Sequence, residues 1–187
     1  MSFALHLACQ VLEDLDPKAI LRHLSANRKR LLSVGETVIS GTGVAQDIMR
    51  ACLYRLQQLD RAKYDEEMEN PDVVDYLENE EPIDEFDPEE YTYEHLFNVM
   101  QEYCPPFTYF GNHETDGSIG CWPPDTMARE ELDQADQLTW YDDRHAEQSE
   151  AIRRGDYTGI LTRYVLIEYR GNLELWDSQR HTLLWTY

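Results

Sequence analysis

The chain has 187 residues, of which 37 are Asp or Glu and 16 are Lys or Arg, so its formal net charge is −21. Such a negative surface argues against direct binding to nucleic acid or to an anionic membrane, because both would repel it. Hydrophobic residues make up 42% of the chain, with 12 Tyr and 4 Trp, which argues against wholesale disorder and is enough for a packed core.

The first 63 residues have the hydrophobic spacing of amphipathic helices. Apolar residues recur at helical spacing over 2–14, and again in a clearer stripe over 43–63. Asp16-Pro17 is a typical start of a further helix, with the Asp as N-cap and the proline in the first turn. We therefore predict an amphipathic helical region over residues 1–63.

Residues 64–102 form an acidic segment. Fifteen of the thirty residues from Asp65 to Glu94 are Asp or Glu, and no Lys or Arg occurs between Lys63 and Arg129. Prolines divide the segment into short helical pieces, and Tyr, Phe and aliphatic residues recur through it. We expect these apolar residues to pack on a core while the carboxylates face water.

The acidic segment carries the partner-binding residues that we predict. A folded array of carboxylates concentrates negative potential and attracts a basic protein. In the extreme form, the carboxylates replace nucleic-acid phosphates and compete for a basic groove. The predicted residues are Asp65, Glu66, Glu67, Glu69, Asp72, Asp75, Glu78, Glu80, Glu81, Asp84, Glu85, Asp87, Glu89 and Glu90. The simplest alternative is a solvated segment that only keeps the protein soluble.

Residues 103–187 begin with an aromatic loop and end with strands. The segment Tyr103–Pro124, YCPPFTYFGNHETDGSIGCWPP, is rich in Gly, Pro, Asn and Asp, so we expect an ordered but irregular loop. A short charged helix is predicted over 143–154. Strands are predicted over 161–168, 172–176 and 182–185, with a tight turn at Gly171-Asn172. The fold class is therefore α+β, an N-terminal helical subdomain followed by an antiparallel β-meander, in one compact domain.

Four residues in and beside the aromatic loop are candidate zinc ligands: His95, Cys104, His113 and Cys121. Their spacing lacks the close pairs typical of structural zinc sites, so we assign no metal. An enzymatic alternative centred on this loop would be zinc- or cysteine-dependent, or hydrolytic with His113 beside Glu114 and Asp116. No nucleophile elbow, phosphate-binding loop or dinucleotide motif occurs, so we assign no catalytic residue and no cofactor.

The segment CPPFTYFGNHETDG from Cys104 is followed by Gly120-Cys121-Trp122-Pro123, and the last hairpin is built around Gly171-Asn172-Leu173. In these stretches the chain resembles a group of uncharacterised acidic proteins from bacteriophages and mobile elements. The resemblance implies an origin among small phage proteins that act on host machinery by binding it. It implies no activity and no catalytic residues.

These features predict an acidic protein that binds and inhibits a nucleic-acid-binding host defence complex, of the anti-CRISPR or anti-restriction type. We expect it in the host cytoplasm, since we find no secretory signal, no membrane-length apolar run and no disulfide framework among four distant cysteines. A further alternative is a self-assembling structural protein. Residues 17–63 hold nine of the sixteen basic residues, which could meet the acidic segment of another copy in a homodimer.

Overall fold

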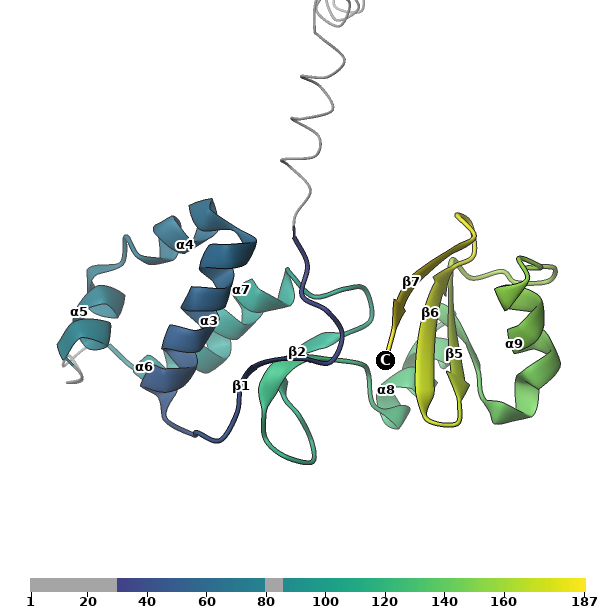
Figure 1. The fold of residues 1–187 in the computed structure, drawn as a ribbon, viewed down its shortest axis with the longest axis horizontal. Coiled ribbons are helices and arrows are strands. Elements are labelled where there is room, and N and C mark those ends of the chain that lie inside the picture. The colour runs from purple at the N-terminus through teal and green to yellow at the C-terminus, as the bar shows by residue number, and fades with distance from the viewer. Residues whose placement is uncertain (1–29, 80–85) are drawn as a thin grey trace, which may run out of the picture. The chain divides into compact units, whose positions relative to one another are not determined.

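The computed structural model describes residues 30–79 and 86–187, and the helices predicted over 2–14 and from Asp16 lie outside them. Within the described part the fold is α+β, as predicted, with several helices followed by a four-stranded sheet (Figure 1). Residues 31–187 form one compact unit. No helix that the structure describes is long and apolar enough to cross a membrane.

Helix α3 (Ala45–Leu59) lies at the centre of the helical part, as its apolar stripe predicts. Its buried side consists of Ile48, Met49, Cys52, Leu53 and Leu56, each at most 3% exposed. Shorter helices lie beside it in Figure 1: α4 (Arg61–Glu67), α5 (Pro71–Asn79), α6 (Pro88–Glu90), the π-helix η1 (Tyr91–Leu96) and α7 (Phe97–Gln101). Helices α5 and α6 each begin with a proline. Proline has no N–H group, and the N–H of a first-turn residue would have no partner within the helix in any case.

The aromatic loop is more regular than we expected. It contains two antiparallel strands, β2 (Tyr109–Asn112) and β3 (Ile119–Trp122), and β3 also pairs with β1 (Glu36–Ile39). The prediction of an irregular loop is therefore wrong. Of the residues that suggested a loop, Gly111, Asn112 and Gly120 belong to the strands, and the prolines flank them. In the hairpin turn between β2 and β3, the His113 N–H donates to the Ser118 carbonyl at 2.6 Å.

The C-terminal meander is confirmed. Strands β5 (Tyr164–Tyr169), β6 (Asn172–Asp177) and β7 (Thr182–Thr186) pair antiparallel in sequence order. The tight turn lies one residue earlier than predicted, because Arg170 and Gly171 are the two residues with positive φ that a type I′ turn requires. We did not predict β4 (Leu138–Tyr141), which joins β5 in parallel and completes the order β4-β5-β6-β7.

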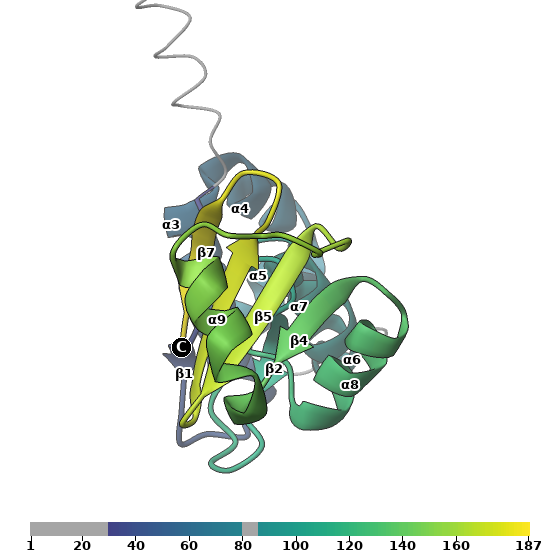
Figure 2. The ribbon, with the colours of Figure 1, turned by 90° about the vertical axis from the view of Figure 1, so that its right-hand side faces the viewer.

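Helices cover both faces of this sheet. The predicted charged helix is present as the 3-10 turn η2 (Asp143–His145) and helix α9 (Ala146–Arg153), and Figure 2 shows α9 across one face. Ile152 of α9 packs there with Val165 and Ile167. Helix α8 (Thr126–Gln134) adds Leu132 to the separate apolar cluster of Leu166, Leu173, Leu175 and Trp185.

Candidate functional site

Ten of the fourteen predicted partner-binding carboxylates belong to the described part of the chain; Glu80, Glu81, Asp84 and Glu85 lie outside it. Nine of these ten are exposed: Asp65, Glu66, Glu69, Asp72, Asp75, Glu78, Asp87, Glu89 and Glu90. Glu67 differs, since only 6% of it is exposed. The structure therefore places most of the array in water and turns one member inward.

Buried contacts hold the acidic helix α5 on α3. Val73 and Tyr76 are 0% and 9% exposed and belong to the same core cluster as the apolar side of α3. The side-chain amide of Gln46 donates to the Tyr76 carbonyl at 3.1 Å, and the Arg50 guanidinium donates to the Leu77 carbonyl at 2.6 Å. Carbonyl groups in the last turn of a helix have no hydrogen-bond donor within that helix. In α5, two polar side chains of α3 supply the missing donors.

This anchoring determines what α5 presents to solvent. Asp72, Asp75 and Glu78 follow one another at intervals of three residues, so they lie on one side of the helix. All three are exposed, whereas Val73 and Tyr76 are buried. The three carboxylates consequently form a fixed acidic face rather than a flexible tail.

Glu67 joins α4 to the π-helix η1. Its carboxylate accepts hydrogen bonds from the Tyr91 hydroxyl at 2.7 Å and from His95 Nε2 at 2.8 Å, and Lys63 Nζ lies 3.2 Å from its other oxygen. Burial alone would raise the pKa of Glu67, but the hydrogen bonds from Tyr91 and His95 outweigh it and lower that pKa below its ordinary value. Glu67 therefore connects α4 to η1 within the acidic segment and stabilises their packing.

Glu67→Gln is expected to lower the free energy of unfolding at neutral pH by about 1–3 kcal/mol, because the variant loses charge-assisted hydrogen bonds. A group whose pKa is lowered by folding stabilises the protein above its unfolded pKa and loses that effect as the pH falls through the folded value. The difference in the free energy of unfolding between the unmodified protein and Glu67→Gln should therefore shrink as the solution is acidified. Urea titrations at several pH values measure it. Glu66→Gln, at an exposed neighbour, is the control, and an equal loss at every pH would contradict the assignment.

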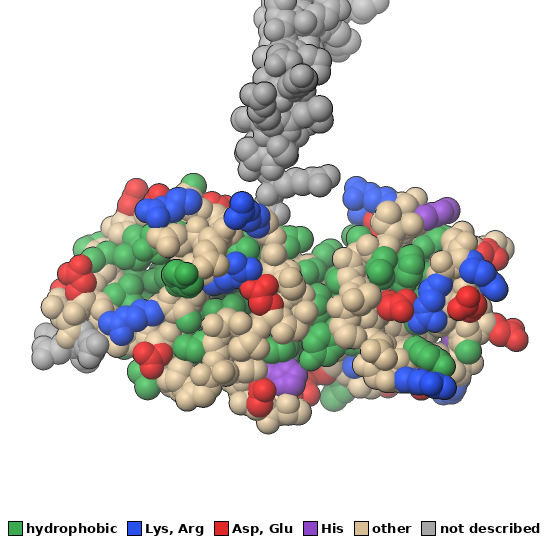
Figure 3. All heavy atoms as spheres, in the orientation of Figure 1, with side chains coloured by type: hydrophobic (Ala, Val, Ile, Leu, Met, Phe, Trp, Pro, Cys, Tyr) green, Lys and Arg blue, Asp and Glu red, His purple; other side chains and the backbone are tan. Residues whose placement is uncertain are grey.

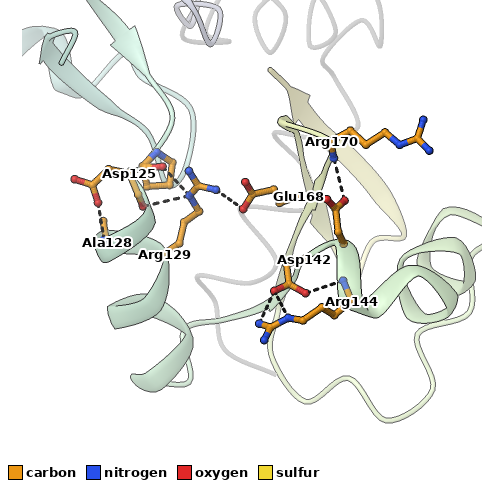
Figure 4. A network of polar contacts seen from close by, with 9 residues as sticks. Asp125, Ala128, Arg129, Asp142, Arg144, Glu168 and Arg170 are labelled. Carbon is orange, nitrogen blue, oxygen red and sulfur yellow. Dashed lines mark hydrogen bonds and ion pairs between the residues drawn. The ribbon is translucent and has the colours of Figure 1, made fainter. Parts of the chain in front are cut away.

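Ion pairs neutralise some carboxylates in both parts of the chain, including Asp65 and Glu66 of the acidic segment. Arg129 of α8 reaches Glu168 of β5 at 2.6 Å, and Arg144 pairs with Asp142 at 2.5 Å, both drawn in Figure 4. Further pairs join Arg153 to Glu174 and Arg163 to Asp177. These acidic residues are neutralised by neighbours and contribute little to a long-range field.

Within the described ranges, by contrast, Asp72, Glu78 and Glu90 have no cationic partner. Residues 31–125 hold 22 acidic and four basic residues, so the negative charge of the chain is concentrated there. The face drawn in Figure 3 shows Lys and Arg side chains among Asp and Glu, which indicates that basic groups are also exposed on this protein. The candidate site is accordingly the set of exposed carboxylates on α4, α5, α6 and η1.

Comparison with protein families, curated proteins and solved structures finds no match to this chain. Neither the phage resemblance nor the expected inhibition gains support from a relative. The function has to be argued from the geometry of the acidic residues.

The candidate zinc ligands do not gather at one point. Of the four, Cys104 and Cys121 are neighbours, and their interaction raises the pKa of Cys104 and lowers that of Cys121. His95 is held by Glu67, and the His113 ring lies 4.5 Å from the ring of Trp122. Among the residues described, no three His, Cys, Asp or Glu side chains form a group that could hold a metal ion.

The hydrolytic arrangement around His113 is a turn network. His113 Nδ1 lies 2.9 Å from the Thr115 hydroxyl and 3.4 Å from Asp116 Oδ1. Asp116 in turn accepts hydrogen bonds from the N–H and hydroxyl of Ser118, which lower its pKa. These contacts lie within the hairpin between β2 and β3 and connect His113 and Asp116 to Thr115 and Ser118, whereas Glu114 takes no part in them.

Proposed function

We propose that this protein is an acidic inhibitor of phage or mobile-element origin. It binds the basic nucleic-acid groove of a host defence complex, of the anti-CRISPR or anti-restriction type, through the exposed carboxylates of α4, α5, α6 and η1. The observation that carries the proposal is the fixed acidic face of α5, which is anchored on α3 and lacks neutralising partners among the described residues. The phage origin rests on the resemblance in the aromatic loop and the last hairpin.

The acidic face presents three carboxylates in succession along one side of a helix. Three residues of an α-helix rise by about 4.5 Å, and phosphates of one DNA strand follow at about 3.4 Å along the axis. The two repeats differ by about a third, so the face offers a row of negative charge to a basic groove rather than a copy of the phosphate positions. Because α5 is already folded, little conformational entropy is lost when a partner binds, which favours affinity.

A self-assembling protein is the alternative that uses the same charges. Its basic surface would come from the nine Lys and Arg residues of 17–63, and those before Arg30 lie outside the described part. Among the described basic residues, Arg55, Arg61 and Lys63 already pair with carboxylates of the same chain, so we propose binding to a separate basic protein.

Displacement of labelled duplex DNA from a panel of purified bacterial CRISPR effectors and restriction enzymes tests the proposed function. We expect the protein to displace DNA competitively from at least one member. Raising the salt from about 50 to about 200 mM should weaken its binding tenfold or more, because the charge pairs are screened. Both proteins must be shown to remain folded at each salt concentration. If the protein displaced DNA from no member of the panel, or if its affinity did not change with salt, the proposed mimicry of nucleic acid would be refuted.

A further inference from the structure

A depression of about 470 Å³ lies where α6 and η1 meet the link between α4 and α5. It combines ring side chains with carboxylates, and we call it the ring–acid socket. Its lining residues are Asn70, Phe86, Asp87, Glu90, Tyr91, Glu94 and His95. Phe86 and Tyr91 also pack against the core, and as partly buried residues they line the socket as well.

The ring wall of the socket is held in place from behind. The Phe86 and Tyr91 ring centroids lie 5.6 Å apart, and those of Tyr91 and His95 lie 5.0 Å apart. Buried Glu67 accepts hydrogen bonds from both Tyr91 and His95, so neither ring turns freely. The wall is therefore formed before any ligand arrives, which reduces the entropy lost on binding. Residues 91–96 are also π-helical, a rare conformation that is frequent at functional sites.

The same helical stretch that carries Tyr91 and His95 also supplies negative charge to the socket. Asp87, Glu90 and Glu94 are exposed, and within residues 30–79 and 86–187 none of the three forms an ion pair. One oxygen of Asp87 accepts the Glu89 and Glu90 N–H groups, and its other oxygen has no such contact in the described part. The three carboxylates repel one another, so a cation in the socket would relieve that repulsion.

We infer that the ring–acid socket receives the guanidinium group of one arginine from the basic partner. This inference rests on the proposed function and adds a specific anchor to it. A guanidinium is flat and weakly hydrated, stacks on aromatic rings and donates two parallel hydrogen bonds to a carboxylate. The socket offers both kinds of contact, whereas a metal ion would need three ligands close together, which the described residues do not provide.

Because of its rings, the socket should bind arginine more tightly than lysine. A lysine ammonium is a compact, strongly hydrated charge, so it gains less from stacking on Phe86 and Tyr91. Carboxylates alone would attract either cation equally. If the rings take part in binding, the socket should therefore prefer arginine over lysine. Attraction by the carboxylates alone predicts no such preference.

The first test titrates blocked arginine, N-acetyl-arginine amide, into the ¹⁵N-labelled full chain. We expect saturable shifts of the Glu90, Tyr91 and His95 amide resonances. Blocked lysine should bind more weakly, and blocked citrulline, a neutral analogue of similar shape, should cause no shift. Equal binding of arginine and lysine, shifts spread evenly over α4 and α5, or no saturable shift at all would each overturn the inference.

Variants locate the binding. Glu90→Gln and Phe86→Leu are each expected to weaken arginine binding about fivefold, the size of a modest cation–π or carboxylate contact. Glu147→Gln removes an exposed carboxylate of α9, and Tyr93→Leu removes a partly exposed ring outside the socket; both should leave arginine binding unchanged. Phe86 also packs on the core, so Glu90→Gln carries the conclusion if Phe86→Leu proves unstable. An effect of Glu147→Gln as large as that of Glu90→Gln would contradict the socket.

The DNA-displacement assay separates this inference from the proposed function. If the unmodified protein displaces DNA and Glu90→Gln does so equally well, the function stands and the socket is wrong. If blocked arginine binds as expected but no defence complex is displaced, the socket stands and the nucleic-acid mimic fails.

Discussion

Replacing Asp72, Asp75 and Glu78 together by lysine is expected to weaken binding to a basic partner by about a hundredfold or more. The three substitutions turn an anchored acidic face into a basic one, and like charges brought together across an interface cost several kcal/mol. The fold should persist, because Val73 and Tyr76 carry the packing of α5 and lysine is a good helix former. The displacement assay measures the loss, and circular dichroism confirms the helix content.

A matched variant separates the position of the charges from their number. Glu130→Lys, Glu147→Lys and Glu150→Lys together change the net charge equally, but at exposed positions of α8 and α9. This variant should retain most of the binding, with a modest decrease that high salt removes. If the two triple variants lost the same affinity, overall charge rather than the acidic face would drive the interaction.

The elements that follow from the sequence are those whose evidence is local. The stripe over 43–63 repeats within one helix, and α3 forms there. Prolines mark the starts of α5 and α6, and the alternating residues after 161 form the meander. In each of these elements, residues close in the sequence determine both the conformation and the buried side.

Two of the elements that we missed, β1 and β4, depend on distant partners. Glu36 of β1 pairs with Cys121 of β3, and β4 becomes a strand by lying beside β5, with Leu138 opposite Tyr164. Each of these strands is only four residues long, so its own periodicity is weak. Pairing across the fold, rather than local preference, decides their conformation.

The candidate site shows the same division. Composition identified the acidic segment and predicted that its apolar residues would hold it on a core, which Val73 and Tyr76 do. Nothing in the sequence separates buried Glu67 from exposed Glu66, and Lys63 pairs with both carboxylates. The contact of Arg50 with the end of α5 also could not be predicted, because it joins helices that only the folded core brings together.

Gly120→Ala is expected to destabilise the protein by about 3 kcal/mol, at the upper end of the usual range for a single substitution. A Cβ atom at Gly120 would lie 2.1 Å from the Glu36 carbonyl oxygen and 3.0 Å from the Thr37 Cα. Both are backbone atoms of β1, so β1 and β3 would have to separate and lose their pairing. Chemical denaturation measures the change in the free energy of unfolding.

Gly111→Ala on the neighbouring strand β2 is the control for this prediction. A Cβ atom there would come no closer than 3.5 Å to the Tyr109 ring, which is an ordinary contact, so we expect a loss below about 1 kcal/mol. The expected difference between the two glycines arises only from the approach of β1 to β3, a contact between residues far apart in the chain. Similar stability of both variants would mean that β1 does not pair with β3 in solution, and the three-stranded sheet would then reduce to the β2–β3 hairpin.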